Sequence, residues 1–179
     1  MRGIFIFVEG NNDELFFKNI IKPKLEGKYD YVKIIKHANE KKEKIKGYIK
    51  SINSMGAEYI FVVDINNSPC ITAKKQEVKN KLKSIDEERI IVVIKEIESW
   101  YLAGLEDAEA EKLGIPIFSN TDNITKEQFD NLIPKKFSRI DFMLEVLRNF
   151  SIKTAKQKNG SFRYLPRSKN LKDSHSCKY

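Results

Sequence analysis

The sequence is poor in several residue types, and each shortage excludes a class of protein. Its 179 residues include two cysteines, Cys70 and Cys177, which lie far apart and lack the paired spacing of a zinc site. Glycine (8) and proline (5) are too scarce for a collagen-like chain or a flexible linker. No apolar run approaches the length of a membrane span, and the N-terminus lacks the cleavage pattern of a signal peptide. We therefore expect a reduced, cytoplasmic protein that does not enter a membrane.

Apolar residues and positive charge are what the chain has in quantity. Hydrophobic residues make up 41% of the sequence, which is enough for one core in a chain of this length. Lys and Arg number 33 against 25 Asp and Glu, so the formal net charge is +8. This balance favours nucleic acid as a partner, although a solvated lysine-rich surface explains the charge equally well.

Apolar runs alternate with charged amphipathic segments over the first part of the chain. Runs of β-branched and aromatic residues predict strands at residues 4–8, 31–35, 59–63 and 90–94. Between them, helices are expected at residues 13–21, 40–53 and 72–84, and we expect Pro23 to end the first helix. This order predicts an α/β fold with a Rossmann-like, mostly parallel four-stranded sheet flanked by helices.

The last third of the chain predicts a C-terminal helical extension. Helices are expected at residues 106–113, 126–132 and 139–150, and the apolar face of the last one is expected to comprise Ile140, Leu144, Leu147 and Phe150. We divide the chain into a core at residues 1–105, an extension packed on it at residues 106–152, and a basic tail at residues 153–179.

The basic tail is a candidate for contact with nucleic acid. Between residues 153 and 172 the chain carries basic side chains and no acidic one. We predict that Arg163, Arg167 and Lys169 contact a phosphate backbone. A disordered basic tail without such a role is the alternative.

Acidic side chains follow three of the four predicted strands. Glu9 follows the first strand and Asp64 the third, while Glu96 and Glu98 follow the fourth. Because ligands bind beyond the carboxyl ends of parallel strands, we expect these acids to converge there, with Asp13 facing the same edge. Crowded carboxylates repel one another, and a divalent cation such as Mg²⁺ relieves that repulsion. The sequence therefore predicts a metal site at this edge.

Each of these acids also has a purely structural explanation. Asp13 suits the first turn of a helix, Asp64 and Asn66 suit a turn before Pro69, and Glu96 suits a helix start. Taken singly, that explanation is preferred for Asp13, Asn66 and Glu96. It is weaker for Glu9 and Asp64, because each follows a strongly apolar strand.

Three segments resemble the motifs of Toprim domains. Residues 5–13 read FIFVEGNND and are similar to the first motif, an apolar strand followed by Glu-Gly and, after two residues, Asp. Residues 61–66 read FVVDIN and resemble the second motif, a strand that ends in Asp-x-Asp. Residues 96–103 read EIESWYLA and are similar to the Glu-x-Glu-x-Trp element of small stand-alone Toprim proteins related to the OLD family of nucleases. Residues 159–162, which read NGSF, look like a short C-terminal motif of that group.

This resemblance implies phosphodiester chemistry that depends on Mg²⁺ or Mn²⁺. By analogy, Glu9 would act as general acid/base or metal ligand, and Asp64 would share the catalytic site. Asp13, Asp64 and Glu98 would hold metal, with Glu96 as the alternative to Glu98.

Asn66 departs from the family pattern, because Toprim domains carry a second Asp at this position. Its amide oxygen can ligate a cation but brings no charge, so two-metal catalysis, a single metal and a site that has lost activity all stay open. The chain has no Walker A phosphate loop, so any ATPase is expected to be a separate subunit.

Three functions follow from this reading. The first is a metal-dependent nuclease acting on DNA or RNA, in a phage-defence or DNA-processing system. The second is a catalytically weakened binding or assembly module that works with a partner ATPase. The third is a phosphohydrolase acting on small phosphorylated molecules.

Other side chains are interpreted more plainly. Trp100 and Tyr101 are expected to anchor their segment to the core rather than to stack on a base. His37 lies either at the rim of the same crevice or on the surface. A solvated helix face is the expected role of Lys41, Lys42, Lys44, Lys46 and Lys50.

Overall fold

A parallel sheet forms the centre of the molecule. The structure is a computed structural model that describes residues 2–165. The four-stranded sheet has the order β2-β1-β3-β4. Its strands are β1 (Gly3–Val8), β2 (Tyr31–Lys36), β3 (Glu58–Asp64) and β4 (Ile90–Val93). Every strand pair is parallel, which confirms the predicted α/β class and sheet.

The strands β1, β3 and β4 are buried on both faces, because successive side chains point to opposite sides of a sheet, whereas the edge strand β2 is only partly buried. Ile6 and Val62 belong to one apolar cluster. Phe7, Phe61 and Val63 belong to a second cluster on the other side. This two-sided burial explains why the strands read as continuous apolar runs.

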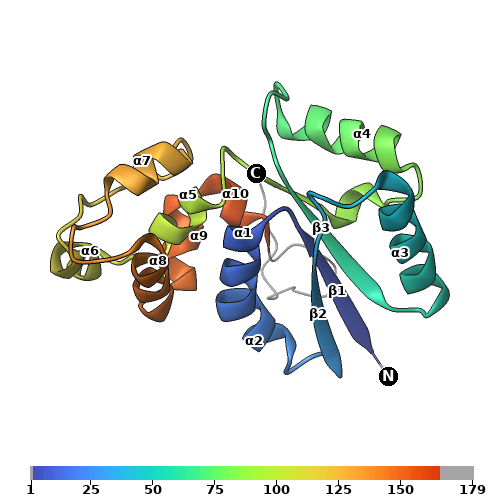
Figure 1. The fold of residues 1–179 in the computed structure, drawn as a ribbon, viewed down its shortest axis with the longest axis horizontal. Coiled ribbons are helices and arrows are strands. Elements are labelled where there is room, and N and C mark those ends of the chain that lie inside the picture. The colour runs from blue at the N-terminus through green and yellow to red at the C-terminus, as the bar shows by residue number, and fades with distance from the viewer. Residues whose placement is uncertain (1, 166–179) are drawn as a thin grey trace, which may run out of the picture.

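Helices cover both faces (Figure 1). On one side, α1 (Asn11–Phe16), η1 (Phe17–Ile21) and α2 (Lys22–Leu25) lead from β1 to β2. On the other side lie α3 (Lys42–Ser54) and α4 (Ile71–Leu82), which precede β3 and β4. The short helix η2 (Glu87–Arg89) follows α4.

The order of the strands reverses between β1 and β3. The chain passes from β1 to β2 at one edge and then crosses back to β3 on the other side of β1. In open α/β sheets, the crevice beyond the carboxyl ends of the strands at such a reversal is where ligands bind. The residues that follow β1 and β3 therefore lie where this type of fold most often binds a ligand.

The first connection differs from the sequence prediction, because the helix does not end at Pro23. The π-helical turn η1 carries the helix from α1 into α2. Pro23 lies in the first turn of α2, a position that tolerates proline because the first N–H groups of a helix have no partner within it. The prediction that proline stops the helix was wrong for this reason.

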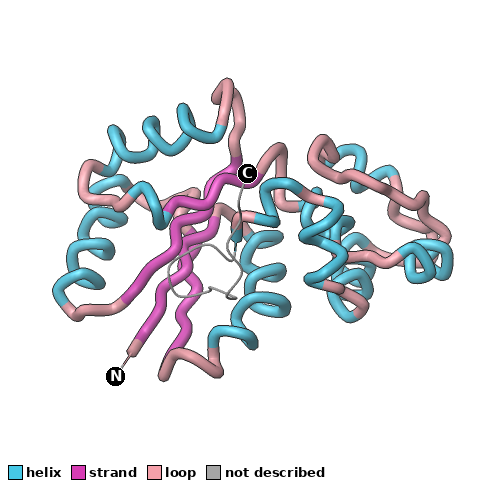
Figure 2. Tube along the Cα trace, turned by 180° about the vertical axis from the view of Figure 1, so that it is seen from behind, coloured by secondary structure: helices cyan, strands magenta, loops and turns pink. Residues whose placement is uncertain are grey.

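The C-terminal extension is helical, as expected. Its three expected helices are α6 (Asp107–Leu113), α7 (Lys126–Asn131) and α8 (Arg139–Arg148). The helix α5 (Glu98–Ala103) precedes them, and α9 (Ile152–Lys158) and α10 (Gly160–Arg163) follow them. Figure 2 shows these helices grouped beside the sheet, on the side away from α3 and α4. None of the helices in the described residues has both the length and the apolarity needed to cross a membrane.

The apolar face of α8 differs from the prediction. Phe142, Met143 and Val146 are buried, whereas Ile140 is 54% exposed. Phe150 lies beyond the last residue of α8. Leu147 is buried as predicted. Helical spacing therefore located the helix correctly but placed its buried face about a quarter of a turn away from the observed one.

The described part of the predicted tail belongs to the core. Residues 152–158 and 160–163 are helical, and α9 packs against α5. Ala155, Phe162 and Leu165 are at most 3% exposed. Basic residues dominate this stretch, yet its few apolar side chains dock it to the rest of the molecule.

Candidate functional site

Glu9 bridges the two strands at the reversal point. It follows the last residue of β1, and its Oε1 accepts a hydrogen bond from the backbone N–H of Asp64 over 2.9 Å. Asp64 is the last residue of β3. Two of the predicted acids therefore meet where the fold favours ligand binding.

Asp13 is buried in the first turn of α1, and its two carboxylate oxygens differ. Oδ2 accepts a hydrogen bond from the backbone N–H of Gly10 over 3.2 Å and so caps the helix. Oδ1 is buried and has no hydrogen-bond partner. The structural explanation proposed from the sequence therefore accounts for only one of the two oxygens.

Asp64 also has a carboxylate oxygen without a partner. Its Oδ1 is also buried without a hydrogen-bond partner. Buried polar side-chain atoms are usually hydrogen-bonded, because removing them from water without a partner is costly. Two unpartnered carboxylate oxygens at one edge therefore indicate a missing donor or cation.

The electrostatics of the edge lead to the same conclusion. Burial, together with smaller contributions from the charges of Glu9 and Glu98, raises the pKa of Asp13 to about 7. Burial raises the pKa of Asp64 to about 9, with the charges of Glu9, Asp13, Glu98 and Glu96 adding to the effect. The five acids predicted from three strand ends therefore act on one another electrostatically.

Glu98 is held more firmly than the other acids. It is the first residue of α5 and is 2% exposed. Its Oε1 accepts hydrogen bonds from Asn12 Nδ2 over 2.8 Å and from Arg139 Nη2 over 2.7 Å. Arg139 also binds Asp130 over 2.6 Å, so the Glu98 carboxylate is fixed to α8 and α7.

Glu96 has a different partner from Glu98. Its Oε2 accepts a hydrogen bond from the backbone N–H of Lys126, at the start of α7. The carboxylate thus compensates one of the unpaired N–H groups of a helix N-terminus. The structural alternative for Glu96 was a solvated acid at the start of its own helix, and the structure shows instead that it binds the start of another helix.

Asn66 is the one predicted ligand that is not an acid. It is exposed, and its φ of 48° places it in the left-handed region, which Asn tolerates better than most residues. It lines a cavity together with Glu9 and His37. Within residues 2–165 no hydrogen bond joins Asn66 to Asp13 or Asp64, so its predicted role as a metal ligand stays a prediction.

Sequence reasoning missed Arg139 and Asn12 as partners of the acids. Arg139 Nη1 also donates to Asn12 Oδ1 over 3.2 Å, and the Tyr101 hydroxyl donates to the Asn12 carbonyl over 2.7 Å. Asn12 lies inside the first Toprim-like motif, so its position was visible. Nothing in the local sequence distinguishes Arg139 from the other basic residues.

Two of the Toprim-like segments interlock. Trp100 Nε1 donates to Ser161 Oγ over 2.8 Å. Asn159 Nδ2 contacts Ser99 Oγ at 3.4 Å, and Asn159 Oδ1 accepts from the backbone N–H of Phe162 over 2.9 Å. Trp100 is fully buried, which confirms the anchoring role predicted for it.

The structure describes one of the three residues that were predicted to contact nucleic acid. Arg163 is exposed on α10, and its Nε donates to the carbonyl oxygen of Lys156 over 3.0 Å. Arg167 and Lys169 lie outside the described residues.

No preformed metal cage exists in the described part of the chain. Among residues 2–165, no group of three or more His, Cys, Asp or Glu side chains is arranged to hold a metal ion. The chemistry of the donors nevertheless fits a hard cation, because buried oxygens of Asp13 and Asp64 lack partners and both carboxyl groups repel their neighbours.

Comparison of the chain with protein-family models, with curated proteins and with solved structures found no match. The resemblance to Toprim domains therefore rests on the three segments and on their order along the chain. Function has to be inferred from the arrangement of the side chains.

Proposed function

We propose that the protein is a Toprim-like nuclease that uses Mg²⁺ or Mn²⁺ to cleave a phosphodiester bond of DNA or RNA. The observation that supports it most is the pair of buried, unpartnered oxygens on Asp13 and Asp64, beside Glu9 at the strand reversal. A divalent cation bound by these residues would remove the repulsion among them and, when bound, polarises a phosphate oxygen.

Glu9 is the residue best suited to handle a proton. Its Oε1 is fixed by the Asp64 backbone, whereas its Oε2 makes no hydrogen bond within residues 2–165. The side chain also lines a cavity of about 360 Å³ at this edge. One carboxylate oxygen is thus held in place while the other is available to a substrate or a water molecule.

Glu98 is proposed as a ligand only through its second oxygen. Arg139 and Asn12 occupy Oε1, and Oε2 has no hydrogen-bond partner in the described residues. The Arg139 guanidinium lowers the negative charge of the edge on this side. Asp13 and Asp64 are therefore expected to contribute most to cation affinity, and Glu98 less.

A binding or assembly module is the second candidate. It is favoured by the ion pair between Glu98 and Arg139 and by Asn66, which takes the place of an acid in the second motif. In this case the protein would keep its fold and its nucleic-acid or partner binding, while a separate ATPase would supply the energy-consuming step.

Metal binding and cleavage together test the proposal. We expect calorimetry to detect Mn²⁺ binding to the parent protein, weaker binding to Asp13→Asn and Asp64→Asn, and unchanged binding to Glu111→Gln. Glu111 is an exposed acid on α6 and provides the matched control.

Cleavage of single-stranded and supercoiled substrates in Mn²⁺ gives the second readout. Glu9→Gln and Asp64→Asn are expected to reduce the rate by about 100-fold or more. Equal cleavage rates in these variants and the parent would contradict the proposal that this site is a nuclease active site. Absent metal binding with intact nucleic-acid binding would favour the module instead, and turnover of free nucleotides alone would favour a phosphohydrolase.

A further inference from the structure

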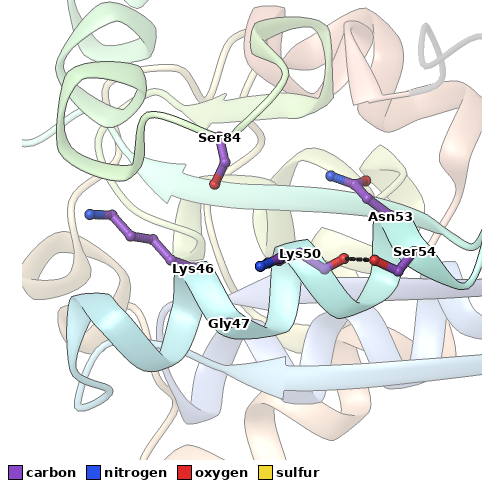
Figure 3. A pocket seen from close by; sticks show the side chains of 6 residues that line it. All are labelled: Lys46, Gly47, Lys50, Asn53, Ser54 and Ser84. Atoms are coloured by element: carbon purple, nitrogen blue, oxygen red, sulfur yellow. Dashed lines mark hydrogen bonds between the residues drawn. The ribbon is translucent and has the colours of Figure 1, made fainter.

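A seam between α3 and α4 carries two cavities on the face of the sheet away from the C-terminal helices. The first, of about 360 Å³, opens at the carboxyl edge and is lined by residues that include Glu9, His37, Lys42, Lys74 and Lys81. The second, of about 530 Å³, lies farther along α3 and is lined by Lys46, Gly47, Lys50, Asn53, Ser54 and Ser84. Figure 3 shows Lys46 and Lys50 on α3, with Ser84 opposite them.

A column of lysines connects the two cavities. Lys42, Lys46 and Lys50 are spaced four residues apart, so they lie on one side of α3 with a rise of about 6 Å between neighbours. Within residues 2–165 none of the three forms an ion pair. Lys44 on the same helix, in contrast, binds Glu40 over 2.8 Å.

Lysines of α4 face the same seam. Lys74 is only 8% exposed, and its partner is the exposed Glu77 at 3.5 Å. The Glu77 carboxylate is shared, because Ser68 Oγ also donates to it over 2.9 Å. Lys81 has no ion pair in the described residues. The same cavity is also lined by Glu9, Glu40 and Glu77, but Glu40 binds Lys44 and Glu77 binds Lys74, so Lys42 and Lys81 are the lysines that remain available to an anion.

The first cavity, at the carboxyl edge, is also lined by apolar and aromatic side chains. The ring of His37 stacks on Phe61 with a centroid distance of 4.4 Å, and its Nε2 lies 2.9 Å from the Val62 carbonyl oxygen. Phe61 and Val63 line the cavity beneath the lysines. Lysines beside apolar and aromatic side chains suit a nucleotide, whose phosphate is charged and whose base and sugar have apolar faces.

We infer that the α3–α4 seam binds the sugar–phosphate backbone of a single nucleic-acid strand. Lys42, Lys46 and Lys50 contact successive phosphates, and the strand ends in the cavity that Glu9 lines. A single strand can lay its backbone along the lysine column and turn its unpaired bases toward the cavities, whereas the bases of a duplex are paired and stacked inside it, so the seam suits one strand and not a duplex. Only the placement of the strand end beside Glu9 rests on the proposed function, because binding of the backbone itself needs no metal.

This assignment revises the interpretation drawn from the sequence. The lysine run of residues 41–50 was expected to be a solvated face, because its charges alternate with Glu40 and Glu43. The structure separates the run by position on the helix. Lys44 is paired with Glu40, whereas the column of every fourth residue faces a cavity.

The test measures strand binding in the presence of a chelator. Binding is monitored by fluorescence anisotropy while the salt concentration is raised from about 50 to 200 mM. The probe is a short labelled single strand, and the test protein carries Lys42→Gln, Lys46→Gln and Lys50→Gln together. The matched control carries Lys18→Gln, Lys24→Gln and Lys28→Gln. These three exposed lysines lie on or next to η1 and α2, on the opposite side of the sheet, so both variants lose the same charge.

We expect the seam variant to bind at least about tenfold more weakly, with a slope of log affinity against log salt that is smaller by about 2. This figure is three phosphate contacts multiplied by about 0.7 for a single strand. The control variant should differ from the parent by much less in both quantities, and a duplex should compete poorly.

Several outcomes would overturn the inference. Equal losses in the two triple variants would show that net charge alone accounts for binding. Effective competition by a duplex, or stronger binding to anionic vesicles than to the strand, would assign the seam to a different ligand. Asp64→Asn is expected to keep full strand binding. Refutation of the nuclease proposal and refutation of strand binding at the seam can therefore be distinguished.

Discussion

The two faces of the sheet are packed in different ways. On the face that carries the C-terminal helices, the ring of Phe16 meets five other aromatic rings at centroid distances between 5.2 and 6.1 Å. On the opposite face, α3 and α4 bury mostly aliphatic side chains and leave two cavities between them.

This difference separates stability from ligand binding. The aromatic face positions α5, and therefore Glu98, against residues that lie far away in the sequence. The lysine-rich face leaves space and unpaired charge beside the same carboxyl edge. We propose that one face fixes the acids while the other is available for ligand binding, and the predictions below test this division.

The largest effect is expected from Trp100→Ala. Trp100 is fully buried, and its indole N–H donates to Ser161, so truncation should lower the free energy of unfolding by about 3–5 kcal/mol. Leu82→Ala on the other face should cost only about 2 kcal/mol, because Leu82 borders an existing cavity. Urea unfolding measures both values. Equal costs would show that the two faces are packed alike.

The second prediction concerns the pH dependence of stability. Because burial raises the pKa of Asp64 from 3.8 to about 9, the folded state keeps a proton that the unfolded state releases between these values. This contribution is complete below about pH 4 and is lost as pH rises through about 9. In a chelator, the melting temperature should therefore fall as pH rises from about 5 to 9.

Asp64→Asn should remove most of this slope and raise the melting temperature at about pH 8 by roughly 5 °C, which corresponds to about 2 kcal/mol. Mn²⁺ should stabilise the parent more at high pH than at low pH, because it binds the ionised carboxylate. Identical slopes for the parent and the variant would mean that Asp64 is not the titrating group.

The sequence predicted the strands and the acids at their ends, because these depend on local patterns. A strand buried on both faces is a continuous apolar run, and its carboxyl end is the next polar residue. Glu9 and Asp64 were found in this way. The acids are brought to a shared edge by the parallel topology, which the alternation of strands and helices also indicates.

The partners of the acids could not be predicted in the same way. Arg139 binds Glu98 across 41 residues, and no local pattern encodes a contact between two helices packed in three dimensions. The role of residues 152–163 was hidden for a related reason. Their charge resembles that of a solvated tail, and only the burial of Ala155 and Phe162 docks them to the core.

The third prediction tests the link between the aromatic face and the acids. Arg139→Gln leaves the buried Glu98 carboxylate with Asn12 as its remaining donor, and we expect a loss of about 1–2 kcal/mol in the free energy of unfolding. The side chain of Arg139 is 28% exposed, which keeps the loss below that of a fully buried pair.

A double-mutant cycle distinguishes the pair from general packing. Glu98→Gln in the same chain should restore most of the lost stability, because the uncompensated charge is then removed. Additive losses in the double variant would show that Arg139 stabilises α8 without acting through Glu98.

The smallest effect is expected on the lysine-rich face. Replacing Lys42, Lys46 and Lys50 with Gln removes two pairs of like charges spaced four residues apart, each of which destabilises a helix by about 0.2–0.5 kcal/mol. The triple variant should therefore be as stable as the parent or up to about 1 kcal/mol more stable in urea unfolding, even though its strand binding is weakened. A loss of more than about 1 kcal/mol would mean that these lysines hold α3 in place, and the division of roles between the two faces would then fail.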